Sequence, residues 1–243
     1  MECAIVLMYH NIGIPPKGVA LKSLYVTPRM FRFQMWCLKT AGFKVVTLQE
    51  ILSFINGKGS DERLVAITFD DGYQDFYDNA FPVLKAYKFP SMVFLVSDLV
   101  GKENLWDSHE VNSIKRLLHW NSILEMKDAG VTFGSHSKTH PFLSKIFGKK
   151  LEDEIKGSKI LLEERLKNPV DFFCYPNGDY DKRVLETVTT AGYKGAVTTK
   201  RGLIHRNDSP FEMTRSFIRY NTHPLLFLYK LYSKYEDRRG LRH

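Results

Sequence analysis

The chain has 243 residues, of which 44% are hydrophobic and 26% charged. This composition excludes an intrinsically disordered protein and supplies apolar material for one large core, so we expect a single domain over residues 1–243. The formal net charge of +8 favours anionic neighbours, although a basic surface that only keeps the protein soluble is the plainer explanation.

The first half of the chain alternates apolar runs with helical patterns. Residues 3–9 form a continuous apolar run, typical of a strand buried on both faces. Thr27 followed by Pro28 predicts the start of a helix that ends near Gly42, and Thr47 caps a second predicted helix over 48–55. The other predicted elements of this half are strands at 45–46, 64–69 and 91–96, and a helix over 76–87.

The second half repeats the alternation. Helices are predicted over 120–130, 149–167 and 181–191, and strands at 131–134, 171–174, 195–198 and 213–218. Strands that alternate with helices call for parallel strands joined by helical crossovers. A closed barrel and an open doubly wound sheet both satisfy this α/β pattern. In either one, chemistry gathers at the carboxyl ends of the strands.

A basic helix is predicted at the C-terminal end, over about 223–238. Apolar residues at 225–232 are followed or interrupted by the cations Lys230, Lys234, Arg238, Arg239 and Arg242. Such a helix could make peripheral contact with an anionic membrane. Packing on the body of the protein through Leu226, Leu228 and Leu231 is the interpretation we prefer.

The three cysteines, Cys3, Cys37 and Cys174, are scattered and form no CxxC pair. This pattern argues against a disulfide framework and fits a reducing compartment. The first residues lack a basic leader and a small-residue cleavage site, and no apolar stretch approaches the ~20 residues that span a bilayer. We therefore expect a cytoplasmic protein, with the membrane as a peripheral partner.

Polar residues follow several of the predicted strands directly. If the strands are parallel, these residues meet at one rim. The four clusters are His10-Asn11, Asp70-Asp71, Ser135-His136 and the segment 175–178.

Asp70 and Asp71 end a buried strand and precede Gly72, which permits a sharp turn. Strand alternation sends the two carboxylates to opposite sides unless the chain leaves the strand here. His136 and His140 lie four residues apart, a spacing that arises easily by chance; the plain interpretation is one buried and one exposed histidine. Their position at a strand end favours two imidazoles on one ion, completed by a carboxylate from another strand.

These motifs resemble carbohydrate esterase family 4, the polysaccharide deacetylases with a NodB homology domain. The resemblance rests on TFDDG at 68–72 and HSKTH at 136–140, in the family's order, and on 7–10 and 173–178. It covers about residues 4–220 and is strongest for the poly-β-1,6-N-acetylglucosamine deacetylase subgroup. It implies a distorted, TIM-barrel-like (β/α) barrel of about seven strands.

The resemblance also implies an activity, the hydrolysis of N-acetyl groups from a polysaccharide or glycolipid with release of acetate. Asp70 would be the catalytic base. Asp71, His136 and His140 would bind a divalent metal, most often Zn²⁺, with Co²⁺, Ni²⁺ and Fe²⁺ as alternatives. Such an ion lowers the pKa of water toward ~7 and polarises the acetyl carbonyl.

The segment of Tyr175, Pro176 and Asn177 would bind the substrate, with a backbone N–H that stabilises the oxyanion. Trp106, Tyr73 and Tyr175 could stack on sugar rings, although filling the core explains Trp106 equally well.

Two positions depart from the family's pattern. Cys174 stands where many members have an arginine that orients the base, and Arg215 stands where they have a histidine as general acid. Arginine cannot donate a proton at neutral pH, but it could orient Asp70. The candidate acids are therefore His10, His205 and Asp70 itself. We interpret His109, His119 and His223 as structural or surface residues.

Two alternatives stay open. One is a deformylase or another amidohydrolase on the same fold, and the other is a glycan-binding protein whose motifs no longer catalyse. No nucleic-acid recognition motif is present, so binding of nucleic acid is not expected.

Overall fold

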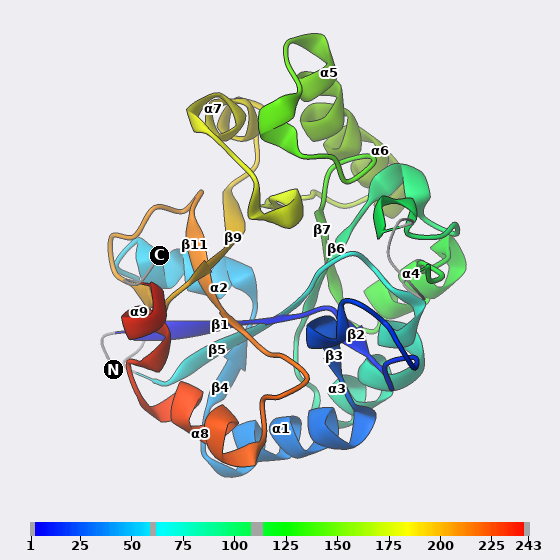
Figure 1. The fold of residues 1–243 in the computed structure, drawn as a ribbon. Coiled ribbons are helices and arrows are strands. Elements are labelled where there is room, and N and C mark those ends of the chain that lie inside the picture. The colour runs from blue at the N-terminus through cyan, green and yellow to red at the C-terminus, as the bar shows by residue number, and fades with distance from the viewer. Residues whose placement is uncertain (1–2, 59–61, 108–113, 241–243) are drawn as a thin grey trace.

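A computed structural model describes residues 3–58, 62–107 and 114–240. Seven parallel strands close into a barrel in the order β1-β11-β9-β8-β7-β6-β5, and β5 pairs with β1 to complete the ring (Figure 1). The closed barrel is confirmed, and the open sheet is wrong. The seven strands are β1 (Cys3–Tyr9), β5 (Leu64–Phe69), β6 (Met92–Leu95), β7 (Thr132–Ser135), β8 (Phe172–Cys174), β9 (Gly195–Arg201) and β11 (Met213–Phe217).

The barrel is distorted because two extra strands pair at its amino end. β4 (Lys44–Val46) pairs with the first half of β5, and β6 takes over that edge only at Thr68. In the same way β10 (Ile204–His205) pairs antiparallel with the start of β1, and β11 pairs with its end. A separate pair, β2 (Asn11–Ile12) and β3 (Tyr25–Val26), lies beyond the carboxyl end of β1.

Helices cover the outside of the barrel, and their caps agree with the sequence. Thr27 caps α1 (Pro28–Thr40), and Thr47 forms a reciprocal capping box with Glu50 at the start of α2 (Leu48–Ile55). The predicted helix over 149–167 is one run of α5 (Lys149–Glu152), a π-helical turn (Asp153–Gly157) and α6 (Ser158–Leu166). The remaining helices before the C-terminal region are α3 (Phe81–Tyr87), preceded by a π-helical turn (Phe76–Ala80), α4 (Trp120–Asp128) and α7 (Lys182–Thr190).

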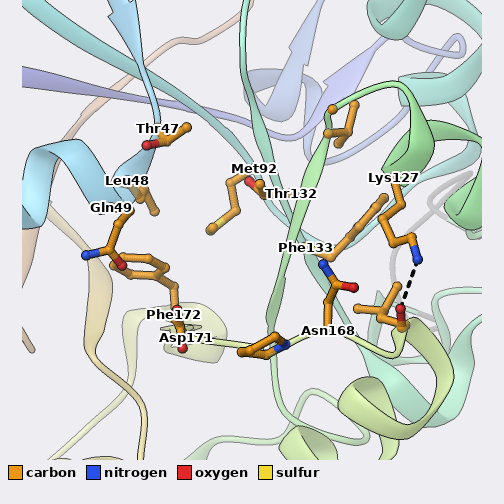
Figure 2. Close-up of a pocket in the computed structure, with 14 residues that line it drawn as sticks. Thr47, Leu48, Gln49, Met92, Lys127, Thr132, Phe133, Asn168, Asp171 and Phe172 are labelled. Carbon is orange, nitrogen blue, oxygen red and sulfur yellow. Dashed lines mark hydrogen bonds between the residues drawn. The ribbon is translucent and has the colours of Figure 1, made fainter.

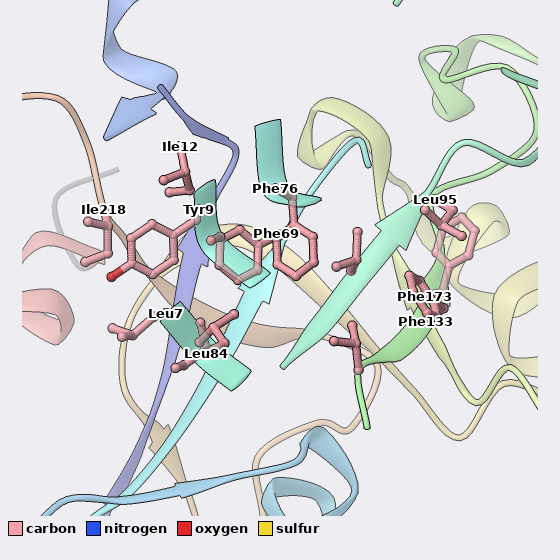
Figure 3. Packing of buried hydrophobic residues seen from close by; sticks show 14 of the residues in the cluster. Leu7, Tyr9, Ile12, Phe69, Phe76, Leu84, Leu95, Phe133, Phe173 and Ile218 are labelled. Carbon is pink, nitrogen blue, oxygen red and sulfur yellow. The ribbon is translucent and has the colours of Figure 1, made fainter. Parts of the chain in front are cut away.

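The main core lies between the barrel and these helices. Tyr9 stacks on Phe69 with ring centroids 5.3 Å apart, and Phe76 packs edge-on against Phe69 at 4.6 Å (Figure 3). A second cluster fills the barrel itself and includes Val6, Ala66 and Phe94. The two clusters follow from strand alternation, which sends successive side chains outward and inward.

The single C-terminal helix expected over 223–238 is wrong. The segment forms α8 (Pro224–Tyr232) and α9 (Tyr235–Gly240), separated at Ser233, whose backbone is extended (φ −132°, ψ 165°). The break turns Glu236 of α9 into the protein, where its carboxylate accepts bonds from Arg201, Ser216 and Lys230. Leu231 and Lys230 are both buried, so α8 packs on the body of the protein through these side chains. Among the described residues, no helix has the length and apolar character to cross a bilayer.

Candidate active site

Four inward-facing side chains form a layer at the carboxyl end of the barrel. Thr68 and Asp70 continue the inward positions of β5 after Ala66, Cys174 ends β8, and Arg215 belongs to β11. All four are buried. Period-two alternation along three strands therefore places them together, although they are distant in sequence.

Arg215 holds Asp70 in this layer. Its Nη1 and Nη2 donate to Oδ1 and Oδ2 of Asp70, both at 2.7 Å. Nε donates to the Thr198 carbonyl at 2.9 Å, and Nη2 also lies 3.3 Å from Sγ of Cys174. Burial alone would raise the pKa of Asp70, but the charge and hydrogen bonds of Arg215 outweigh it and hold that pKa below its ordinary value. Asp70 is therefore an oriented carboxylate.

Asp71 turns away from the strand and faces two imidazoles. Its backbone is left-handed (φ 72°), and Gly72 follows with φ 69°, so the chain bends at the point where alternation would have sent the side chain outward. Oδ1 lies 3.3 Å from Nε2 of His136 and 3.5 Å from Nε2 of His140. The sharp turn thus brings both carboxylates of the pair into one site.

The loop after β7 directs the two histidines to the same point. Ser137 and His140 have left-handed backbones (φ 62° and 64°), and Ser137 Oγ accepts from the His140 amide. Glu154, in the π-helical turn, accepts from the amides of Lys138 and Thr139 at 2.9 and 3.0 Å. The Glu154 carboxylate satisfies these two amides, while the Ser137 and Lys138 carbonyls accept from the amides of Ser97 and Asp98, so both sets of bonds hold the loop.

The three side chains fit a divalent cation. Ligand atoms ~2.0–2.1 Å from a zinc ion lie about 3.3 Å apart in a tetrahedron, which matches the separations from Asp71. Nδ1 of His136 lies 2.7 Å from the Cys174 carbonyl, an acceptor, so a neutral His136 turns its Nε2 lone pair toward Asp71. Two acceptors facing each other need a cation or a proton between them.

The two other histidines of the site are biased toward the neutral form. Burial lowers the pKa of His140 to about 3, against the opposing effect of Asp71 and Asp70. Burial also lowers the pKa of His10, against the opposing effect of Asp70 and Asp71. Neutral imidazole is the form that binds metals and accepts protons.

A pocket of about 240 Å³ opens above these groups. His10 lies in its wall with Nε2 3.8 Å from Oδ2 of Asp70, and its buried Nδ1 has no hydrogen-bond partner among the described residues. Trp106 stacks on the ring of His140, with centroids 4.4 Å apart and planes 25° from parallel. Further lining residues are Met8, Leu21, Leu24, Asp107, Thr199 and Phe217.

The segment after β8 reaches the pocket in part. Asn177 is exposed and lines the pocket, while Pro176 is buried. Gly178 N–H donates to the Tyr175 carbonyl at 2.9 Å, and Tyr175 N–H makes only a long bond of 3.4 Å to Val197. Pro176 has no N–H, so the amides of Tyr175 and Asn177 are the candidates for an oxyanion donor.

Of the aromatic residues predicted to stack on sugars, Tyr175 and Trp106 line the pocket and Tyr73 does not. Tyr175 is fully buried, stacks on Tyr180 and donates to the Phe211 carbonyl. Tyr73 is also buried, and its hydroxyl hydrogen-bonds to Asp71. Both rings are buried, so neither presents an exposed face to a sugar in this structure. Trp106 is half-buried and lines the pocket.

His205 is wrong as a candidate acid. It pairs with Cys3 at the amino end of β1, the opposite end of that strand from the pocket, and its Nε2 lies 3.2 Å from Asp237. His223 caps α8 by accepting from the Leu226 amide, and His119 precedes α4. His109 and Arg242 lie outside the described residues.

Lys115 was missed by sequence reasoning because a lysine in a loop carries no local signal. Its ammonium donates to Oδ1 of Asn11 at 2.7 Å and lies 3.9 Å from the ring centroid of Tyr25 and 4.8 Å from that of Tyr73. It therefore joins β2 and the loop after β5 to β3, and fixes the residue that follows His10. Glu154 was missed for the same reason, as an acid in an apparently solvent-facing helix.

A second hollow, of about 280 Å³, lies at the opposite end of the barrel (Figure 2). It is lined by Met92, Thr132 and Phe172, the first residues of β6, β7 and β8 or close to them. Its one cation, Lys127, donates to the Leu166 carbonyl (Figure 2). The groups that can bind a metal or move a proton are gathered at the carboxyl end, as parallel barrels require.

Comparisons with known proteins agree with this geometry. The sequence profile of the polysaccharide deacetylase family matches residues 57–196. The poly-β-1,6-N-acetyl-D-glucosamine N-deacetylase of Staphylococcus aureus is 27% identical over 207 residues, which cover 82% of this chain and 69% of that protein.

Two solved structures have the same fold. A deacetylase of Streptococcus pyogenes, PplD, solved in complex with acetate, superposes with a TM-score of 0.83 at 27% identity and covers 95% of this chain and 99% of that one. A polysaccharide deacetylase of Bacillus cereus superposes with a TM-score of 0.80 at 30% identity, covering 95% of this chain and 69% of that one. With the profile match extending over more than half of its residues, the chain belongs to the polysaccharide deacetylase family.

Proposed function

We propose that the protein hydrolyses N-acetyl groups from a carbohydrate in a metal-dependent reaction and releases acetate. One observation carries the proposal: Asp71, His136 and His140 converge on one point while a second, oriented carboxylate, Asp70, lies beside them. Membership of the deacetylase family supports the same reaction.

Asp71, His136 and His140 would hold the metal, and Zn²⁺ suits a set of two imidazoles and one carboxylate. When bound, the ion supplies Lewis-acid chemistry, polarising the acetyl carbonyl and making water more acidic. Cys174 contributes its backbone carbonyl, which orients His136 through Nδ1. Three protein ligands leave room for water and substrate, as in catalytic sites.

Asp70 would accept the proton of the attacking water. A general base must be ionised and correctly aimed, and the bidentate contact from Arg215 provides both. Arg215 itself is fully engaged with Asp70, Thr198 and Cys174, and its pKa is raised, so it is no proton donor.

His10 is the candidate that delivers a proton to the departing nitrogen. It lines the pocket and lies 3.8 Å from Asp70, close enough to receive the proton that Asp70 has taken. Burial lowers its pKa, so the ring starts neutral. Negative charge that develops on the acetyl oxygen would stabilise the imidazolium and raise that pKa during the reaction.

An amide of the segment 175–177 would stabilise the oxygen of the tetrahedral species. The Asn177 amide belongs to a residue with left-handed backbone (φ 59°) at the pocket wall, where Thr199 packs against Gly178. A backbone donor held in this way loses no freedom when the oxygen becomes charged.

The substitution Asp70→Asn tests the proposal. Acetate release from N-acetylglucosamine oligomers should fall by about 10²–10⁴-fold, and the zinc content measured by mass spectrometry should stay that of the wild type. Release of formate from N-formyl analogues in place of acetate would favour the deformylase. Oligomer binding without turnover by metal-loaded wild type would contradict catalysis and favour the binding protein.

A further inference from the structure

Two outer helices form a surface that the proposed reaction does not use. α1 and α8 lie next to each other against the barrel (Figure 1). The buried residues of α8 are Phe227, Lys230 and Leu231, so the opposite side of the helix faces outward. That outward side carries Leu225, Tyr229 and Tyr232, with exposed fractions of 74%, 48% and 52%.

The outward side of α1 combines cations with a tryptophan. Arg29, Arg32 and Lys39 are exposed, and Trp36, between them on the same side, is 51% exposed. Within the described part of the chain, none of the three cations has an ion-pair partner within 4 Å. We call the outward residues of both helices the α1–α8 face: Arg29, Arg32, Trp36, Lys39, Leu225, Tyr229 and Tyr232.

The charge of the α1–α8 face has one sign. Neither α1 nor α8 contains an aspartate or a glutamate. A further cation, the guanidinium of Arg63, lies 5.0 Å from the ring centroid of Tyr232 at the edge of the face. Part of the protein's positive charge thus lies beside exposed aromatic and aliphatic groups, with no acidic residue on either helix.

We propose that the α1–α8 face docks the protein on an anionic lipid bilayer. Tryptophan and tyrosine prefer the interface between headgroups and acyl chains, and leucine prefers the acyl chains themselves. Arginine and lysine beside them attract anionic headgroups. Such a face lies on the membrane, with its apolar residues about 5–10 Å deep, and does not cross it.

Other occupants fit the composition less well. A two-fold dimer would place the same patch against itself, so Arg29, Arg32 and Lys39 would meet their own copies without an acid to neutralise them. A soluble anionic glycan would satisfy the cations but leave Leu225 in water. A bilayer with anionic headgroups satisfies both kinds of residue.

The location differs from the one expected from the sequence. Lys230, one of the cations of the predicted basic C-terminal helix, is buried and paired with Glu236, whereas Lys234, Arg238 and Arg239 are exposed. In α9, Asp237 accepts from the Leu203 amide and lies beside His205. In the proposed contact the charge comes from α1, nearly 200 residues earlier in the chain, and α8 supplies the apolar part.

Vesicle co-sedimentation of the full chain tests the proposal. We expect binding to vesicles of about 30% phosphatidylglycerol in phosphatidylcholine, little binding to pure phosphatidylcholine, and weakening as salt is raised. Arg29→Gln with Arg32→Gln should lower the partition coefficient about fivefold for each charge removed. Leu225→Ser with Tyr229→Ser should lower it by about tenfold or more.

Matched controls carry the same changes on other helices. Lys149→Gln with Lys150→Gln removes two exposed cations of α5, and Ile160→Ser removes an exposed apolar side chain of α6. Both controls should bind vesicles like the wild type. All variants should release acetate from soluble oligomers at the wild-type rate, since none of these residues lines the pocket.

Trp36 reports the contact directly. Its fluorescence should shift to the blue when anionic vesicles are added, and Trp36→Phe should abolish that shift while Trp106 and Trp120 remain. Wild type that stays in the supernatant with anionic vesicles at low salt would overturn the proposal. Equal loss of binding in the α5 controls would overturn the assignment to the α1–α8 face.

Discussion

The guanidinium of Arg215 donates to both carboxylate oxygens of Asp70, a residue 145 positions earlier in the chain, at 2.7 Å each. The family resemblance predicts an orienting arginine at the position that Cys174 occupies. Here the arginine comes from β11 and contacts the Cys174 sulfur on its way to Asp70. Asp70 is therefore oriented by a residue of β11 and not by one at the position of Cys174.

Replacing Arg215 should shift the pH dependence of activity. Arg215 holds the pKa of Asp70 low, and Asp70 must be ionised to accept a proton. Activity should fall as the pH drops through the pKa of Asp70. Removing the bidentate contact raises this pKa, so the acidic limb of the pH profile moves to higher pH. Arg215→Lys should show this shift and lose about 10–100-fold in kcat, because lysine cannot form the paired bonds.

Cys174→Ala is the control for this substitution. It removes a thiol that touches Arg215 but keeps the backbone carbonyl that orients His136. Its acidic limb should stay that of the wild type. Arg215→Met should in addition destabilise the fold by about 3–5 kcal/mol, because it leaves a buried carboxylate unpaired; urea unfolding measures this. An unmoved acidic limb in Arg215→Lys would show that Asp70 does not limit activity.

Glu154 should control metal affinity without touching the metal. Its carboxylate accepts from the amides of Lys138 and Thr139 and from the Thr139 hydroxyl, within the loop that carries His136 and His140. Glu154→Gln should lower zinc affinity about 10–100-fold in competition with a chromophoric chelator. Glu152→Gln, an exposed change two residues earlier in the same helical run, should leave it unaltered. Equal zinc affinities in Glu154→Gln and the wild type would mean that the loop keeps its shape without the Glu154 carboxylate.

Trp106 should contribute to substrate binding through its face. The ring stacks on His140 and lines the pocket, where it can contact a sugar ring. Trp106→Ala should raise KM for N-acetylglucosamine oligomers about two- to tenfold, and Trp106→Phe should retain most of the affinity. A fall in zinc content in Trp106→Ala would show instead that the ring acts mainly by supporting His140.

Asp75 should make folding stability depend on pH. Burial raises the pKa of Asp75 to about 6 from 3.8, so between these values the folded chain keeps a proton that the unfolded chain has released. Stability from this group is therefore present below its unfolded pKa and is lost as the pH rises through about 6. The difference in unfolding free energy between wild type and Asp75→Asn should change between about pH 4.5 and about pH 7. A constant difference would contradict the raised pKa.

Much of the barrel was predictable because its signals are local. The apolar runs at 3–9 and 64–69 are β1 and β5 with the expected bounds, and Thr27 and Thr47 cap α1 and α2 as their side chains indicate. The ladder of β9 runs to Arg201, three residues beyond the predicted end, because the polar residues there pair with β11. The extra residues are not apolar, so the sequence does not mark them as a strand; they form one because β11 lies beside them.

The sequence by itself determined the period of each element and, through it, the strand ends where Asp70, Asp71, His136 and His140 lie. It could not determine which distant residue completes each contact. Arg215 reaches Asp70, Glu154 holds the histidine loop, and Ser233 ends α8 so that Glu236 can turn inward. His205, an equal candidate in sequence, lies at the other end of the barrel. Periodicity is encoded within a few neighbouring residues, whereas these pairings depend on how strands and helices far apart in the chain pack around a common core.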